Sequence, residues 1–363
     1  MSKNRQITIV DIAEAAGVSI ATVSNVLNRR NVPMSEDTIR KVEEAAERLG
    51  YRRNVMAANL SRRKSYELGM LVPSFSGYYG RFAEEMQRKA HTYGYHLSVF
   101  SAAGFDPEIE QRHLDVLLQR RVDGLFCHGL AMTTEATRRI VGDGTPLVLF
   151  NGWGWPSDLA AGAVNLDFAG GCIEAVQHLY DYGCRRLYYV GKARAHATDQ
   201  QRRIGFEEGV RRLAEPVTAE LISGDGAVGL EQLLDQQLLQ VEPGKPTGIL
   251  AFDDFDAFTV MSAVMKRGLR VPEDVQLVGI NNDPISQVCY PTLTTVAIPY
   301  HEQAQLAMRL MLLKLGEQNR LKQADGDSTD DHDQLLEQQE IRIPLRLIQR
   351  MSTGQRPSGA AMS

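Results

Sequence analysis

Apolar residues recur at helical spacing in two short segments near the N-terminus, 9–16 and 20–27. The apolar positions are Ile9, Ile12, Ala13 and Ala16 in the first segment and Val23, Val26 and Leu27 in the second. Gly17 supplies the positive φ that a sharp helix exit requires. Thr8 and Ser19 can cap the two helices. The pattern therefore predicts a helix, a tight turn and a second helix.

The second helix turns a short, mostly uncharged face away from its apolar side. This face consists of Ile20, Ala21, Thr22, Ser24 and Asn25. A face of this size and polarity can enter the major groove of DNA. The alternative is a small helical hairpin that only packs against the rest of the chain.

A third helix is predicted after Ser35, which can cap it, with acidic residues in its first turn. Its apolar stripe consists of Ile39, Val42, Ala45, Ala46 and Leu49. Gly50 ends the helix. A brief helical segment at 54–60 and a basic run at 62–64 follow. Together these elements predict an all-α head.

From Leu68 onward, strand-like apolar runs alternate with amphipathic helices, which predicts parallel sheets with helices on both faces. The predicted strands are 68–73, 96–101, 122–128, 146–151, 186–191, 248–252, 275–280 and a last strand at 341–348. The predicted helices are 81–93, 107–120, 134–141, 170–182, 200–213 and 257–268. A second α/β unit is expected to begin near 163–166.

Two α/β units side by side form a cleft, and ligands of open α/β sheets lie at the carboxyl ends of the strands. Polar and aromatic residues follow several predicted strands. They are Ser74, Ser76, Tyr78 and Tyr79, then Asn151, Trp153 and Trp155, then Asp253 and Asp254, and finally Asn281, Asn282 and Asp283. The sequence thus predicts a ligand site in the cleft.

Charge is distributed unevenly along the 363 residues. Residues 1–65 hold 12 Lys and Arg against 7 Asp and Glu, about +5, whereas the whole chain carries −5. The remainder is therefore at −10, and a basic head on an acidic body is typical of a DNA-binding head with a separate sensing body. The sequence contains no apolar run of membrane-spanning length and no apolar stretch near its N-terminus, so we expect a cytoplasmic location.

Metal and cofactor chemistry is not indicated. The cysteines Cys127, Cys172, Cys184 and Cys289 are scattered without metal-ligand spacing, and we interpret them as reduced thiols. The acidic, glutamine-rich segment 323–339 has too few apolar residues for a core, which indicates a solvated insertion. The alternative of a calcium loop lacks the required glycine and terminal glutamate spacing.

The order of these parts resembles the LacI/GalR family of bacterial repressors. The matching motifs are DIAEAAGVS and TVSNVLN in the first two helices, the third helix beginning at Ser35, the LGYRRN turn and the A-x-x-L hinge at 57–60. The blocks 121–124, 202–206, 268–279 and 291–296 extend the resemblance through the body. Two departures are Asn25, where the family usually has Arg, and Arg53, where it usually has Pro.

The resemblance implies a helix-turn-helix head at 1–52, a hinge helix and linker at 53–65, a two-lobed body at 66–350 and a flexible tail at 351–363. The body would have the periplasmic-binding-protein fold. Its chain would cross between the lobes near Val164 and Thr295, and 296–315 would return to the first lobe.

The resemblance also implies the DNA contacts. Ile20, Ala21 and Asn25 would touch base edges, and Asn in place of Arg implies an altered operator half-site. Leu60 would be a minor-groove wedge; the alternative is that it packs the hinge helix on the head. The full implied set is Thr8, Ser19, Ile20, Ala21, Thr22, Ser24, Asn25, Asn28, Asn54, Ala57 and Leu60.

In the cleft, Arg202 aligns with the family's ligand arginine, whose guanidinium can bind vicinal hydroxyls or a carboxylate. Asn281 stands where the family usually has Asp, and Asp253 stands where it usually has Asn. These replacements change the positions of hydrogen-bond donors and acceptors in the cleft. The full implied effector set is Ser74, Tyr78, Tyr79, Asn151, Trp153, Phe168, His196, Arg202, Asp253 and Asn281.

The function expected from the sequence is a homodimeric transcriptional repressor on a palindromic operator, controlled by a small sugar or sugar derivative. One alternative is a sugar-binding protein of transport, which the basic head and the lack of an export signal disfavour. Another is an enzyme using Asp253 and Asp254 as acid and base. Neighbours in sequence rarely face one substrate together, and no nucleophile–base set or phosphate loop is present.

Overall fold

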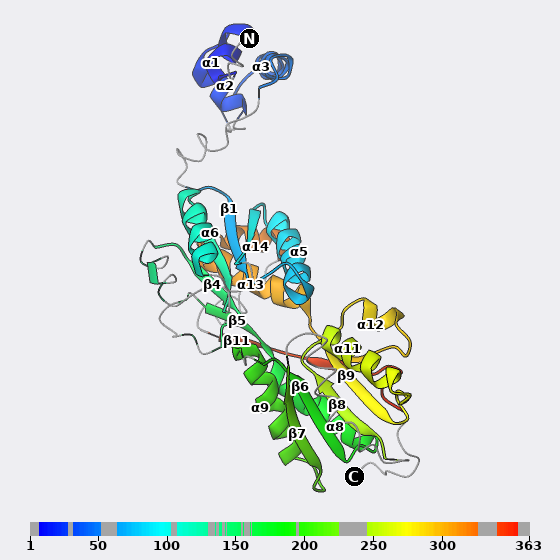
Figure 1. The fold of residues 1–363 in the computed structure, drawn as a ribbon. Helices are drawn as coiled ribbons and strands as arrows, with labels where there is room; N and C mark the ends of the chain where they lie inside the picture. The colour runs from blue at the N-terminus through cyan, green and yellow to red at the C-terminus, as the bar shows by residue number, and fades with distance from the viewer. Residues whose placement is uncertain are drawn as a thin grey trace. The chain divides into compact units, whose positions relative to one another are not determined.

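The computed structural model divides the chain into two compact units, 1–65 and 66–363 (Figure 1). It describes residues 7–27, 32–51, 64–102, 107–129, 144–153, 162–193, 196–224, 245–325 and 340–354, and the single positions 135, 138, 139, 142, 155 and 160. Most of the predicted helix at 134–141 and most of the acidic segment 323–339 lie outside these residues.

The head contains the three predicted helices, α1 (Ile9–Ala16), α2 (Ile20–Leu27) and α3 (Glu36–Arg48). The backbone N–H of Thr8 donates to the Asp11 carboxylate at 2.7 Å, and Gly17 ends α1 with φ 68°. The hydroxyls of Ser19 and Ser35 accept from backbone N–H groups in the first turns of α2 and α3. These local bonds satisfy helix-end donors, so the ends lie where the sequence places them.

One small core joins the three helices of the head. Its buried side chains are Ile12, Ala13, Val23, Val26, Val42 and Ala45. Among the described residues, no single helix is long and apolar enough to cross a membrane, and α1 and α2 meet that test only as a pair bent by 107°.

The first sheet of the body has six parallel strands in the order β11-β5-β4-β3-β1-β2. The strands are β1 (Glu67–Val72), β2 (His96–Ser101), β3 (Gly124–His128), β4 (Leu147–Phe150), β5 (Gly162–Asp167) and β11 (Glu340–Pro344). Helices α5 (Gly77–Thr92), α6 (Pro107–Gln119) and α13 (Tyr300–Lys314) pack on it, and α14 (Gln318–Asp325) follows α13. This sheet and its helices form the first lobe.

The second sheet has the order β12-β10-β9-β8-β6-β7 and is parallel except for β12. Its strands are β6 (Arg186–Gly191), β7 (Thr218–Ser223), β8 (Thr247–Ala251), β9 (Val275–Asn281), β10 (Thr294–Ala297) and β12 (Arg346–Ile348). Helices α8 (Phe168–Asp181), α9 (Ala197–Arg211), α11 (Asp254–Lys266) and the short α12 (Ile285–Val288) complete the second lobe.

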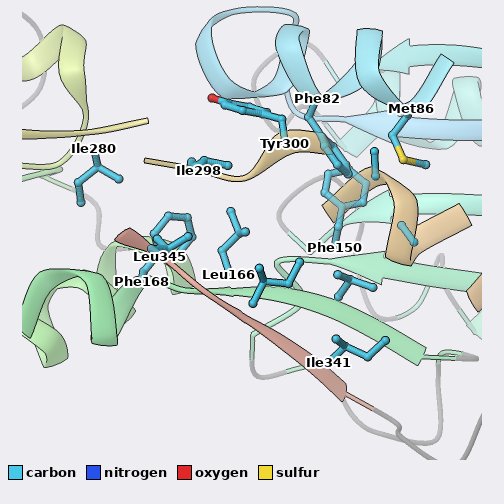
Figure 2. Close-up of a cluster of buried hydrophobic side chains, with 14 of the residues drawn as sticks. Phe82, Met86, Phe150, Leu166, Phe168, Ile280, Ile298, Tyr300, Ile341 and Leu345 are labelled. Carbon is cyan, nitrogen blue, oxygen red and sulfur yellow. The ribbon is translucent and has the colours of Figure 1, made fainter. Parts of the chain in front are cut away.

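Within the described residues, the chain passes between the lobes three times. The first passage follows Asp167, because β5 pairs in the first sheet up to that residue, and the second follows Ala297. The predicted last strand, 341–348, is two strands that belong to different sheets, with Leu345 between them. Figure 2 shows Phe168, Ile298 and Leu345 gathered with other apolar side chains where the lobes meet.

Two further differences between the structure and the sequence prediction concern an exposed edge strand and the segment after residue 350. The edge strand β7 was not predicted, because only one of its six residues is buried and it has no apolar run. The expected tail from 351 is built into the second lobe as far as Gly354, with Ser352 and Thr353 buried. The Ser352 hydroxyl accepts from the Thr294 N–H and donates to the Leu277 carbonyl oxygen.

Candidate DNA-binding helix and effector cavity

In the head, α2 has one buried side and one open side. Val23 and Val26 are buried, whereas Ile20 is 47% exposed and Ala21 is also exposed. Thr22, Ser24 and Asn25 are half-buried. Because the Ile20 side chain is exposed, it is not part of the core of the head and is available for contact with another molecule.

The remaining predicted DNA contacts divide into two groups. Thr8 and Ser19 are exposed at the starts of α1 and α2, where backbone N–H groups can meet phosphates. Asn28, Asn54, Ala57 and Leu60 lie outside the described residues.

In the body, a cavity of about 120 Å³ lies where the carboxyl ends of strands from both sheets meet. Its lining consists of Ser76, Gly77, Tyr78, Tyr79, His128, Asn151, Phe168, Thr198, Arg202, Phe252, Asp253 and Asn281. Seven of these were predicted as effector residues, namely Tyr78, Tyr79, Asn151, Phe168, Arg202, Asp253 and Asn281.

Three predicted effector residues do not line the cavity. The Ser74 hydroxyl hydrogen-bonds to the Ser76 hydroxyl at 2.9 Å, and His196 precedes α9 as its N-cap. The Trp153 ring lies 5.1 Å from the guanidinium carbon of Arg342 and outside the cavity wall.

Some lining residues were missed, although a simple rule could have found two of them. His128 is the last residue of β3, and Phe252 directly follows β8, so both stand at strand ends. Thr198 and Gly77 carry no comparable sequence signal, because the packing of α9 and α5 places them at the cavity.

Arg202 is the most unusual lining residue, since its charged side chain is only 4% exposed. Its guanidinium carbon lies 3.7 Å from the ring centroid of Phe168 and 4.2 Å from that of Phe252. Nη1 donates to the Thr198 carbonyl oxygen at 2.9 Å, whereas the buried Nε has no hydrogen-bond partner among the described residues. A buried cation is normally paired, so this geometry leaves donor capacity for a ligand.

Tyr78 and Asn151 hold the cavity wall together. The Tyr78 hydroxyl donates to Gln303 Oε1 at 2.8 Å and accepts from Asn151 Nδ2 at 3.1 Å. Asn151 Oδ1 accepts from the Leu166 N–H at 3.2 Å. Because these polar atoms are already paired within the protein, Tyr78 and Asn151 shape the site more than they offer free groups to a ligand.

Burial sets the protonation of the neighbouring groups. It lowers the pKa of His128 to about 3, helped by the Arg202 charge, so this imidazole is neutral near pH 7. It raises the pKa of Tyr79 to about 12, so its hydroxyl stays protonated. The rings of His128 and Tyr79 meet edge to face, with their centroids 5.0 Å apart.

Asn281 and Asp253 approach the cavity from the second lobe. Asn281 is 4% exposed, its backbone has φ 120°, and its Oδ1 has no hydrogen-bond partner. Asp253 is the N-cap of α11, and its Oδ1 accepts from the Asp256 N–H at 2.9 Å. The cavity therefore combines an available guanidinium, an unpaired amide oxygen and a carboxylate with aromatic faces, a set suited to a small polar ligand.

Comparison with known proteins agrees with this architecture. The model of bacterial regulatory proteins of the lacI family matches residues 8–54, and a periplasmic binding protein-like domain matches residues 176–353. Catabolite control protein A of Staphylococcus aureus (strain MRSA252) is 29% identical over 306 residues, covering 84% of this chain and 91% of its own. The protein of the same name from Priestia megaterium is 29% identical over 313 residues, with the same two shares.

Solved structures share the fold of the whole chain. A lac repressor dimer bound to operator and an anti-inducer aligns with a TM-score of 0.76 at 22% identity, covering 96% of this chain and 99% of that one. The complex of the transcriptional regulator CelR with cellobiose aligns with a TM-score of 0.64 at 21% identity, covering 95% and 99%. The resemblance predicted from the sequence is confirmed: the chain is a transcriptional regulator of the lacI family, with a helix-turn-helix head and a two-sheet, periplasmic-binding-protein-like body.

Proposed function

We propose that this regulator is a repressor whose affinity for operator DNA is controlled by a small sugar-like effector bound in the cavity of the body. The observation that supports this most directly is the buried Arg202, held between two aromatic rings with an unpartnered Nε. Two regulators of similar fold form complexes with cellobiose and with D-xylulofuranose. A sugar offers what this cavity would bind, namely hydroxyls for polar groups and an apolar ring face for aromatic side chains.

Each lining group would have a definite role toward such an effector. The Arg202 guanidinium would donate to two neighbouring hydroxyls or to a carboxylate. The Asn281 amide oxygen and the Asp253 carboxylate would accept from hydroxyls. Phe168 and Tyr79 would lie against the sugar ring. Because His128 is neutral, it would act as a donor or an acceptor and would add no positive charge.

On the DNA side, α2 would enter the major groove with Ile20, Ala21 and Asn25 toward the bases. Asparagine can bond in a bidentate manner to adenine, and the apolar side chains can contact a thymine methyl group. Exposed hydroxyls near the helix starts would meet phosphates, which position the head without reading sequence. Leu60 remains our candidate for a minor-groove wedge within a hinge at 53–65.

A homodimer on a palindromic operator completes the proposal, because two identical heads read two half-sites. The second lobe supports it with exposed apolar side chains on α11, on α12 and just after α12. Phe255 is 68% exposed, Ile285 51%, Val288 77% and Tyr290 81%. Because the Asp283 N–H donates to Asp254, α11 and α12 begin beside one another. Exposed apolar patches of this kind mark contact surfaces.

The alternatives are less well supported. Asp253 and Asp254 do not form an acid–base pair toward the cavity, since Asp254 is fully buried and accepts hydrogen bonds from Thr295 and Asp283 instead. We therefore propose a regulator without enzymatic activity that acts in the cytoplasm, where its DNA target lies. A transport protein would have no use for the helix-turn-helix head.

The test is calorimetric titration of the full chain with a panel of sugars, sugar acids and sugar phosphates. Calorimetry is preferable to tryptophan fluorescence, because neither Trp153 nor Trp155 lines the cavity. For the compound that binds, Arg202→Met should weaken affinity by about tenfold or more, since a charged hydrogen bond is worth about 1.5–3 kcal/mol. Arg211→Met, on the exposed side of the same helix, should leave affinity unchanged.

Equal affinity in wild type and Arg202→Met would contradict the assignment of the cavity. Steady turnover of any of these compounds by the purified chain would contradict the assignment as a regulator. Operator release or strengthened operator binding on adding the effector would then distinguish an inducer from a co-repressor.

A further inference from the structure

Arg81 reaches from one lobe of the body to the other. It lies on α5 in the first lobe, and its Nη1 donates to the Asn282 carbonyl oxygen and to Asp283 Oδ1, each at 3.0 Å. Both acceptors follow β9 in the second lobe. The same nitrogen is 3.4 Å from the Asn281 carbonyl oxygen and 3.5 Å from the Tyr300 hydroxyl. Because an NH₂ group carries only two hydrogens, the two shorter contacts are the main bonds.

The surroundings of Arg81 strengthen this bridge. Its guanidinium carbon lies 4.2 Å from the centroid of the Tyr300 ring, at the start of α13. The side chains of Arg81 and Asp283 are 36% and 18% exposed, so solvent screens this ion pair less than a fully exposed one. A planar guanidinium can stack on the ring and donate at its edge at the same time, which a lysine ammonium cannot do.

The groups that accept hydrogen bonds from Arg81 are held in place by other residues of the second lobe. Asn281 and Asn282 have φ angles of 120° and 54°, a region that residues other than glycine rarely occupy. Surrounding bonds maintain it, since the Asn282 N–H donates to Thr295 Oγ1 at 3.2 Å and Asn282 Oδ1 accepts from Arg350 Nη2 at 2.7 Å. The segment therefore presents its carbonyl groups in a fixed direction.

Both ends of the bridge adjoin the cavity. On α5, Arg81 follows the lining residues Tyr78 and Tyr79 within one helical turn. In the second lobe, the lining residue Asn281 directly precedes Asn282. Breaking the Arg81 contact would thus release the two opposing walls of the cavity from each other.

We infer that Arg81 is a latch that stabilises the closed arrangement of the two lobes and so sets how readily the cavity opens. Arg81 acts as a positioning residue, because it lines no part of the cavity itself. The inference rests on the proposed effector function of the cavity and adds a side chain that controls access to it. An effector that binds the closed lobes would be held more tightly and released more slowly with the latch intact.

Hydrogen–deuterium exchange of the full chain tests the latch without any effector. In Arg81→Gln, the peptides 76–84 and 279–290 should exchange about tenfold faster than in wild type, because losing about 1.4 kcal/mol of stabilisation raises the open population tenfold. Peptides covering β3 and β6, which are inner strands of the two sheets, should keep their wild-type rates. Arg81→Lys should fall between, since it keeps the charge and loses the stacking.

Two further variants make the outcome decisive. Arg88→Gln removes an exposed arginine that pairs with Glu85 on the same helix, and it should leave all peptides unchanged. Asp283→Asn should reproduce the effect of Arg81→Gln, and the double variant should add little to either single change.

The inference is overturned if Arg81→Gln exchanges like wild type at both cavity walls, or if every peptide of the body accelerates equally, which indicates general destabilisation. These outcomes are separate from a failure of the proposed function. A chain that binds no sugar could still show the latch, and loss of effector binding in Arg202→Met would leave the exchange pattern unaltered.

Discussion

Asp254 offers a test of how burial shapes the second lobe. Its side chain is fully buried, and Oδ1 and Oδ2 accept from the Thr295 hydroxyl and the Asp283 N–H, each at 2.6 Å. Desolvation nevertheless dominates and raises its pKa from 3.8 to about 7. The folded chain therefore holds a proton at this site at pH values where the unfolded chain has lost it.

The direction of the pH effect follows from proton binding. Between pH 4 and pH 7 the folded state binds more protons here than the unfolded state, so this site lowers the stability of the fold as pH rises. The difference between 3.8 and about 7 corresponds to about 4 kcal/mol, at 1.36 kcal/mol per pKa unit. About 3 kcal/mol of this falls between pH 5 and pH 8.

Asp254→Asn removes the titration and keeps a group that can bond to both Thr295 and Asp283. We expect the stability of this variant relative to wild type to rise by about 3 kcal/mol from pH 5 to pH 8, measured by urea unfolding at several pH values. Asp274→Asn is the control in the same lobe. The Arg270 guanidinium lowers the pKa of Asp274 below its usual value, so Asp274 is ionised in both the folded and the unfolded chain above pH 5, and its removal should give a stability difference that is flat from pH 5 to pH 8. A flat difference for Asp254→Asn would refute the reasoning.

Three other predictions concern the head and the end of the chain. Ser352→Ala leaves the Thr294 N–H and the Leu277 carbonyl buried without this partner. It should cost about 2–6 kcal/mol in urea unfolding, at about 1–3 kcal/mol for each orphaned group, and an unchanged urea midpoint would contradict the observed packing. Ile12→Ala should cost the head about 2–5 kcal/mol and abolish DNA binding while body unfolding stays unchanged, whereas Val10→Ala, at a 43% exposed position, should be mild. DNA affinity should fall steeply with salt, because a basic head displaces counterions, and a salt-independent affinity would exclude this docking.

Local features made the head predictable. The turn at Gly17 and the caps at Ser19 and Ser35 depend on residues within three or four positions of one another, and the structure contains each of them. The alternation of strands and helices in the body was predictable for the same reason, since burial of one helix stripe leaves a periodic trace in the sequence.

The failures arose where the partner of a segment lies far away in the chain. The apolar alternation of 341–348 indicates a strand and cannot specify that it splits between two sheets at Leu345. The exposed edge strand β7 leaves almost no apolar trace. Ser352 is polar, and its bonds to β9, to the Thr294 N–H and to the Thr292 carbonyl oxygen place it in the core.

For the cavity too, the sequence predicted some lining residues correctly and others wrongly. The rule that ligands lie at strand ends located Asn151, Asp253 and Asn281, since it depends only on strand order along the chain. It also favoured Trp153, whose ring lies against Arg342 outside the cavity wall, because position along a strand does not fix side-chain direction.

By itself, the sequence determined the helix-turn-helix head, the two α/β lobes and the family to which the chain belongs, because these depend on local periodicity and short motifs. Only the tertiary structure decided that Arg202 is buried with no ion pair among the described residues and that Arg81 bridges the lobes. Both arginines stand on helices, where the sequence alone allows a solvated surface residue. Their roles come from groups about 30 to 200 positions away along the chain, which folding brings within a few ångströms.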